Sequence, residues 1–131
     1  MLNNVYFKGL AGVALCAASF LFGAADGLIM ALLAITAIDF ATGIAKAISQ
    51  KGLSSRKMFA GGALKIGLFL VVAVANIIDV ALHLGGVLRA ATISYFIANE
   101  AISILENWGA LGLPIPQKLR DVLSQLKNDY N

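Results

Sequence analysis

Residues 89–126 decide the fold, and they read RAATISYFIANEAISILENWGALGLPIPQKLRDVLSQL. The stretch begins as an apolar helical pattern that carries Asn99 and Glu100 side by side, and it then reaches Trp108. Gly and Pro residues at positions 109, 112, 114 and 116 break the pattern before a short amphipathic helix follows. Because Trp is enriched at membrane–water interfaces, we interpret the stretch as a helix leaving a membrane, an interface anchor at Trp108 and a helical tail outside.

The composition supports a membrane protein. Hydrophobic residues make up 60% of the 131 residues and charged residues only 13%, whereas soluble domains have about 45–50% and about 25%. A small soluble domain could not bury that much apolar surface. The fold class predicted is therefore an all-α integral membrane protein of one domain. The net charge of +3 is modest and does not indicate nucleic-acid binding.

The apolar runs predict about four transmembrane helices. A transmembrane domain over residues 1–110 would contain spans at about 5–22, 28–48, 62–84 and 87–107, and residues 111–131 would form a cytoplasmic amphipathic helical tail. The first run, with Lys8 before it and small residues after it, also has features of a signal peptide. We prefer a retained span, because its removal would leave an odd number of spans. Ser54 or Ser55 is expected to cap the third helix, and Gly85-Gly86 to form the turn before the fourth.

Basic residues predict the orientation. With four spans, nine of them fall on one side of the membrane and only Arg89 falls on the other. Lys and Arg accumulate in cytoplasmic loops, so both termini are expected in the cytoplasm. The nine are Lys8, Lys46, Lys51, Arg56, Lys57, Lys65, Lys118, Arg120 and Lys127.

Catalytic chemistry is not indicated. The chain has one His and one Cys, no cluster with metal-ligand spacing, no nucleophile elbow and no glycine-rich phosphate loop after a strand. We therefore predict no enzymatic activity, no metal and no cofactor. Cys16 lies in an apolar run and is interpreted as a small buried hydrophobic residue.

Polar residues inside the spans are the candidate site, because intramembrane polarity marks function or pairing. Asn99, Ser103 and Glu106 recur at helical spacing, and Thr92 extends this stripe. Asp39 and Glu100 are expected at similar depth, so one is protonated, or a base such as Lys46 or Lys65 reaches them, or water does. The candidate oligomer seam or lumen comprises Asp39, Thr42, Asn99, Glu100, Ser103 and Glu106. The alternative is that these groups satisfy one another within one subunit.

Two further sets of residues are singled out. Asp79, His83 and Arg89 are expected near the outer surface, with an Asp79–Arg89 pair across the Gly85-Gly86 turn. The tail is expected to lie on the inner leaflet or against the tail of a second copy. Its apolar stripe consists of Ile115, Leu119, Val122, Leu123 and Leu126.

Several of these segments resemble the toxin-secretion/phage-lysis holin family, which includes phage holins of Gram-positive hosts and the holin-like protein encoded beside clostridial toxins. The matching segments are IDFATG at residues 38–43 (the family's D-x-x-T-G pattern), KGLSS at 51–55, FIANEAISILEN at 96–107 and GLPIP at 112–116, followed by Lys118-Leu119. The match of the first span is loose.

The resemblance implies a function without a catalytic site. Such proteins accumulate in the bacterial cytoplasmic membrane, self-associate and permeabilise it, so that an endolysin or a toxin leaves the cytoplasm. The implied partners are further copies of the chain, the lipid bilayer and the released protein. Two other functions remain open from the residues themselves: a small four-helix transporter, and a membrane scaffold whose tail recruits a partner.

Overall fold

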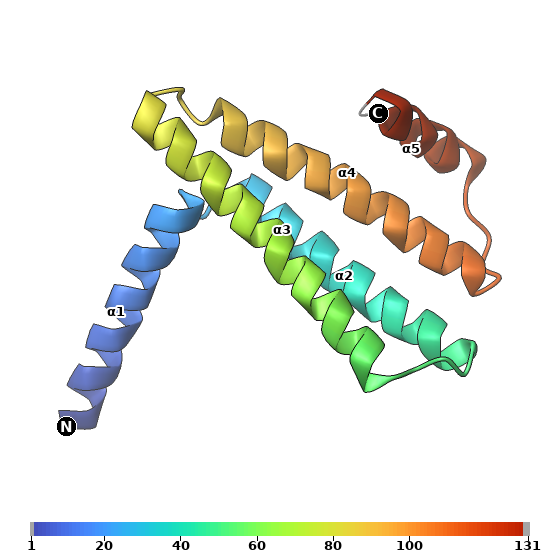
Figure 1. Ribbon diagram of the computed structural model, residues 1–131, viewed down its shortest axis with the longest axis horizontal. Coiled ribbons are helices and arrows are strands. Elements are labelled where there is room, and N and C mark those ends of the chain that lie inside the picture. The colour runs from blue at the N-terminus through green and yellow to red at the C-terminus, as the bar shows by residue number, and fades with distance from the viewer. Residues whose placement is uncertain (1, 130–131) are drawn as a thin grey trace.

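The computed structural model describes residues 2–129, and its side chains are described for residues 4–122, 124 and 125. Within these residues every regular element is a helix (Figure 1). In chain order the helices are α1 (Leu2–Phe22), α2 (Gly27–Ser49), α3 (Ser55–Leu82), α4 (Val87–Ala110) and α5 (Gln117–Asp129). The predicted all-α fold is confirmed.

Local sequence signals set the helix boundaries. The Asp26 carboxylate accepts a hydrogen bond from the backbone N–H of Ile29 at 3.1 Å and caps α2. Ser54 caps α3 in the same way, accepting from the N–H of Lys57 at 3.2 Å. Between α3 and α4, Gly85 and Gly86 adopt φ values of 70° and 86°, which L side chains rarely adopt. The predicted cap and turn are confirmed.

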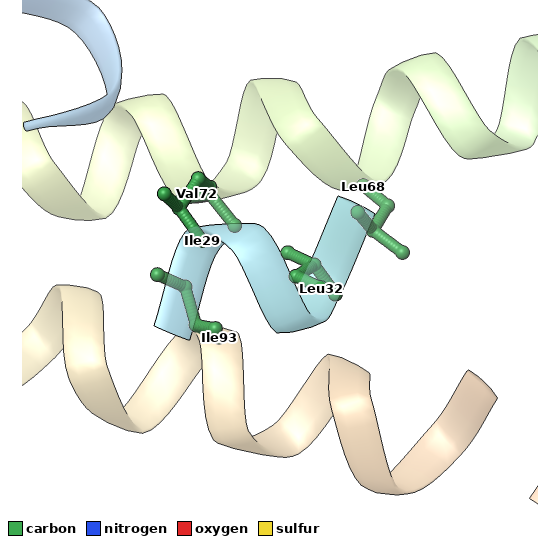
Figure 2. Packing of buried hydrophobic residues seen from close by; sticks show 5 residues of the cluster. All are labelled: Ile29, Leu32, Leu68, Val72 and Ile93. Carbon is green, nitrogen blue, oxygen red and sulfur yellow. The ribbon is translucent and has the colours of Figure 1, made fainter. Parts of the chain in front are cut away.

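Helices α2, α3 and α4 form a bundle around a small apolar core. Helix α4 packs against both α2 and α3, which contact each other much less, and Figure 2 shows side chains from all three helices meeting. The core residues are Ile29, Leu32, Leu68, Val72 and Ile93. Those of α2 lie three residues apart and those of α3 four, the spacing that puts side chains on one helix face.

Helix α1 stands away from the bundle and meets it only at its C-terminal end (Figure 1). Every residue from 4 to 21 is exposed. At the end of α1, the ring of Phe22 meets Phe69 edge-on at a centroid distance of 6.3 Å. The Asn76 side chain donates a hydrogen bond to the backbone carbonyl of Phe20 at 3.0 Å. These contacts attach one end of α1 to α3.

Many large apolar side chains lie on the surface of the molecule, while much of its interior is polar. Large apolar side chains are exposed along α3, as at Phe59 and Leu64, whereas seven polar or charged residues are buried in the bundle. Within the described residues, three helices are long and apolar enough to cross a membrane: Asn4–Phe22, Gly27–Ser49 and Ser55–Leu82. Helix α4, with 24 residues, is also long enough but carries Arg89, Glu100 and Glu106.

Helix α5 follows a turn at Gly112, whose φ is 76°, and folds back beside α4 (Figure 1). Around the joint, Pro114, Ile115 and Leu119 line a hollow together with Ile104, Leu105 and Trp108 of α4. Ile115 is half-buried, whereas Leu119 and Val122 are exposed. The side chains of Leu123 and Leu126, the other two residues of the predicted stripe, lie outside those described.

Candidate functional site

The centre of the bundle holds an ion-paired triad, formed by Asp39 of α2, Lys65 of α3 and Glu100 of α4. The Nζ atom of Lys65 lies 2.6 Å from Asp39 Oδ2 and 2.5 Å from Glu100 Oε2. Both carboxylates are buried, with side-chain exposures of 7% and 4%. One ammonium group therefore joins three helices. The sequence left open whether one carboxylate is protonated, a base reaches both or water does. The structure shows the second arrangement, with Lys65 as the base.

Asn107 of α4 extends this triad toward the end of the bundle. Its side-chain amide donates to Asp39 Oδ1 at 3.2 Å and to Thr42 Oγ1 at 3.3 Å. Its carbonyl oxygen accepts a hydrogen bond from Lys46 Nζ at 3.4 Å. The hydroxyl of Thr42 donates in turn to the backbone carbonyl of Asp39 at 2.9 Å. Because buried polar groups are costly unless they are hydrogen-bonded, these bonds are what allow the polar interior to persist.

Helix periodicity explains why these side chains meet. Asp39 lies seven residues after Leu32, and Lys65 lies seven before Val72, so each continues the core face of its own helix. On α4, Ile93, Glu100 and Asn107 also recur every seven residues. The apolar core and the polar interior are therefore successive layers of one interface between helices.

A second polar cluster ties the α1–α2 turn to the start of α4. The guanidinium of Arg89 donates to Asp26 Oδ2 at 2.7 Å from Nη1 and to Asp26 Oδ1 at 3.2 Å from Nη2. It also donates to the backbone carbonyls of Phe22 at 2.6 Å and Ala24 at 2.9 Å. The hydrogen bond from Arg89, with a further one from the Ile29 N–H, lowers the pKa of Asp26 from 3.8 to about 2.

Asp79 contacts Arg89, but through the backbone of Arg89. Its carboxylate accepts hydrogen bonds from the N–H groups of Leu88 at 3.1 Å and Arg89 at 2.6 Å, and so caps α4. The expected ion pair of Asp79 with the Arg89 side chain is therefore wrong, because the guanidinium reaches across to Asp26. His83 is exposed and ends α3 in the left-handed conformation, with φ 54°.

The predicted polar stripe of α4 lies on a different face from the triad. Asn99 and Glu106 are exposed, and Thr92 and Ser103 are half-buried. We call these four residues the polar flank of α4. Adjacent residues point about 100° apart on a helix, so Asn99 is turned outward while Glu100 is enclosed. The six candidate seam residues thus separate into an internal group (Asp39, Thr42, Glu100) and an outward group (Asn99, Ser103, Glu106).

The described contacts at the α4–α5 joint lie on another part of α4 than Asn99 and Ser103. The joint between α4 and α5 meets Ile104, Leu105 and Trp108, which lie round the helix from Asn99 and Ser103. Trp108, the expected interface anchor, is 41% exposed there. Among the described residues, no three His, Cys, Asp or Glu side chains are grouped so as to hold a metal ion.

Sequence reasoning gave no site role to Asn107 or Asp26. The seven-residue recurrence of Ile93, Glu100 and Asn107 was a usable signal for Asn107. Asp26 had no comparable signal, because its partner Arg89 is 63 residues away and the connection depends on how the helices pack.

Several known proteins are similar in sequence to this chain. The family described as the bacteriophage holin family matches residues 16–128. A probable holin of Bacillus phage phi105 is 42% identical over 113 residues, which cover 86% of this chain and 83% of that protein. An uncharacterised protein of Clostridium perfringens, from the region 3′ of nagH, is 44% identical over 112 residues and 84% of each chain. An uncharacterised Bacillus subtilis protein is 40% identical over 110 residues, or 84% of this chain and 78% of that protein. No solved structure matches.

Proposed function

Because the chain belongs to the bacteriophage holin family, whose members are non-enzymatic pore-forming membrane proteins, we propose the following way in which it opens a lesion in the membrane. Copies associate side by side in the bacterial cytoplasmic membrane through the polar flank of α4. At a threshold the cluster opens, and an endolysin or a toxin passes out of the cytoplasm. The relative from Bacillus phage phi105 is itself described as a probable holin, which supports this function.

The exposure of Asn99 carries the proposal. Polar side chains that face lipid are expensive, and in membrane proteins they face a partner helix or water. Here the hollow at the α4–α5 joint lies on another side of α4, and the three-helix bundle occupies the side bearing Ile93 and Glu100. A second copy of the chain would cover the polar flank in a closed cluster. Water would cover it in an open one.

The internal triad has a complementary role in this proposal. Lys65 joins α2, α3 and α4 through two carboxylates, so the bundle behaves as one unit when subunits meet. The polar flank is then presented at a fixed angle to the triad, because Glu100 of the triad is also on α4. We assign Asp39, Thr42 and Glu100 to holding the subunit together, and Asn99, Ser103 and Glu106 to the seam or lumen.

We further propose four membrane spans with both termini in the cytoplasm. Helix α4 at 24 residues is about 36 Å long, enough for a hydrocarbon core of about 30 Å. Its buried Arg89 and Glu100 are paired within the bundle, which lowers the cost of insertion. The nine basic residues opposed to Arg89 support the orientation. In this arrangement residues 111–131 form the cytoplasmic tail.

The test replaces Asn99 with leucine. An interhelical hydrogen bond in lipid contributes about 0.6 kcal/mol on average, roughly threefold in the association constant. Because a cluster contains many such contacts, Asn99→Leu should delay the onset of lysis after induction and reduce the oligomers extracted in detergent. The control is Ser94→Leu, since Ser94 is also exposed on α4 but lies about 140° round the helix from Asn99.

If cells that express Asn99→Leu lyse at the same time as cells that express the wild type, the polar flank has no role in the mechanism. Membrane potential should be followed in the same cultures. A holin stops growth abruptly and depolarises the membrane, whereas a transporter changes drug tolerance. A scaffold would lose its partner, with permeability unaffected, when the chain is cut after Pro114.

A further inference from the structure

A partly enclosed cavity of about 210 Å³ lies between α2 and α3, beside the loop that joins them. It is separate from the polar flank of α4. Its walls are mostly apolar, and it touches the triad at one end, where Asp39 and Lys65 contribute to the lining. The main apolar lining residues are Phe40, Ile44, Ala47, Leu53 and Met58.

Two glycines make room for this cavity. Gly43 of α2 and Gly61 of α3 both line it. A Cβ atom built on Gly61 would meet nothing within 4 Å, and one on Gly43 would meet only the amide nitrogen of Asn107 at 3.7 Å. Larger residues at these positions would therefore project into space that is now empty. The cavity follows from the sequence at these two positions.

The end of the cavity nearest the loop is basic. Lys57 and Ser54 line it there, and Lys51 and Arg56 lie nearby in the chain. All three basic residues are exposed. The chain has no acidic residue between Asp39 and Asp79, so the loop itself contributes nothing to offset their charge. Lys65, at the other end, is already engaged by two carboxylates.

The length of α3 places this basic end at the depth of lipid headgroups. With 28 residues, α3 is about 42 Å long and exceeds a hydrocarbon core of about 30 Å. Its first turns, which include Lys57, therefore extend into the headgroup region. Gly61 and the apolar wall formed by Phe40 and Ile44 lie deeper. The cavity thus has an apolar part at acyl-chain depth and a cationic end at phosphate depth.

We propose that this cavity binds an anionic phospholipid from the surrounding bilayer, with its phosphate at Lys57 and part of one acyl chain along Phe40, Ile44 and Gly61. The charge of the loop selects an anionic headgroup, because basic groups at a membrane surface attract anionic lipids. The apolar walls distinguish a lipid from a free phosphate ion. The bound lipid would fill the space between α2 and α3 where the two glycines leave no side chains.

The test uses the purified full-length protein and native mass spectrometry with added phosphatidylglycerol or phosphatidylcholine. The wild type should retain phosphatidylglycerol preferentially, and Lys57→Gln should reduce this preference about fivefold. Gly61→Leu should abolish retention of either lipid by filling the cavity. Gly62→Leu is the matched control, since a Cβ there also meets nothing within 4 Å but Gly62 does not line the cavity. Lys118→Gln, in the tail, is the control for charge.

Circular dichroism of each variant establishes that the helices are retained. Equal retention of the two lipids by the wild type would overturn the proposal, as would unchanged retention in Gly61→Leu. Displacement of the lipid by millimolar inorganic phosphate would show a simple anion site and would also overturn it. Because lipid retention is measured without lysis, the result is independent of the function proposed for the polar flank.

Discussion

Asp39 on α2 and Glu100 on α4 are 61 residues apart in sequence, yet both accept hydrogen bonds from the single ammonium group of Lys65. Two buried carboxylates at one site would repel each other, so the lysine between them is what allows both to be enclosed. The packing of α2, α3 and α4 thus depends on one side chain, that of Lys65 on α3.

Lys65→Met should therefore be strongly destabilising. Removing one partner of a buried ion pair costs about 3–5 kcal/mol, because a charge is left uncompensated, and here two carboxylates lose their partner. Denaturant unfolding in detergent, followed by circular dichroism, measures the loss. The triple variant Asp39→Asn, Lys65→Met, Glu100→Gln should recover much of the stability. Equal midpoints for Lys65→Met and the wild type would show that the triad contributes nothing to stability.

Gly23→Ala tests the attachment of α1. Gly23 has a φ of 76°, and an added Cβ would lie 2.8 Å from Asn76 Oδ1 and 2.9 Å from Arg89 Nε. The left-handed conformation alone costs a non-glycine residue about 1–2 kcal/mol, and the clash displaces groups that hold the end of α1. We expect a lower thermal midpoint in detergent. Gly27→Ala is the control, because Gly27 begins α2 and a Cβ there meets nothing within 4 Å. Equal midpoints for both variants would contradict this account.

The Asp26–Arg89 contact predicts a response to acid. The pKa of Asp26 falls from 3.8 to about 2 in the folded protein, so its stabilising contribution is complete above pH 3.8 and is lost as the pH falls toward 2. The contribution is modest, since the Asp26 side chain is 40% exposed. A spin label on Cys16, the single cysteine and an exposed one, should report greater mobility of α1 over this range.

Asp26→Asn provides the comparison for that measurement. At neutral pH the label in this variant should already be as mobile as in the acidified wild type, and it should change little between pH 5 and pH 2. A wild-type spectrum that is the same at both pH values would show that the contact does not restrain α1.

Helix formation was predictable from sequence because it depends on local signals. Apolar runs, the Ser54 cap and the Gly85-Gly86 turn each act within a few residues. The pairing of charges depends on the rotation and packing of whole helices. Arg89 was expected to pair with nearby Asp79, but the two N–H groups at the start of α4 occupy that carboxylate. Cys16 was expected to be buried, and the detachment of α1 leaves it exposed.

The sequence predicted at what level of the bundle the candidate residues lie, but not toward which side of the helix each side chain points. Asp39 and Glu100 do meet at one level of the bundle, as their positions in the predicted spans indicated. Asn99 and Glu100 are neighbours in sequence and were assigned to one seam, but the helix turns them to different faces. Spacing shows which residues share a face. It does not show which face the other helices will cover.

The attachment of α1 at one end has a mechanical consequence. The contacts that hold α1 involve Phe20, Phe22 and the turn that follows, so they all lie at its C-terminal end. The exposed part of the helix, residues 4–21, is an arm about 27 Å long. Rotation of this arm breaks no contact in the apolar core of α2, α3 and α4. Folding of the bundle and the direction taken by the arm are therefore separate degrees of freedom. The area that a subunit would occupy in the plane of a bilayer therefore depends on the direction of α1 as well as on the packing of the bundle.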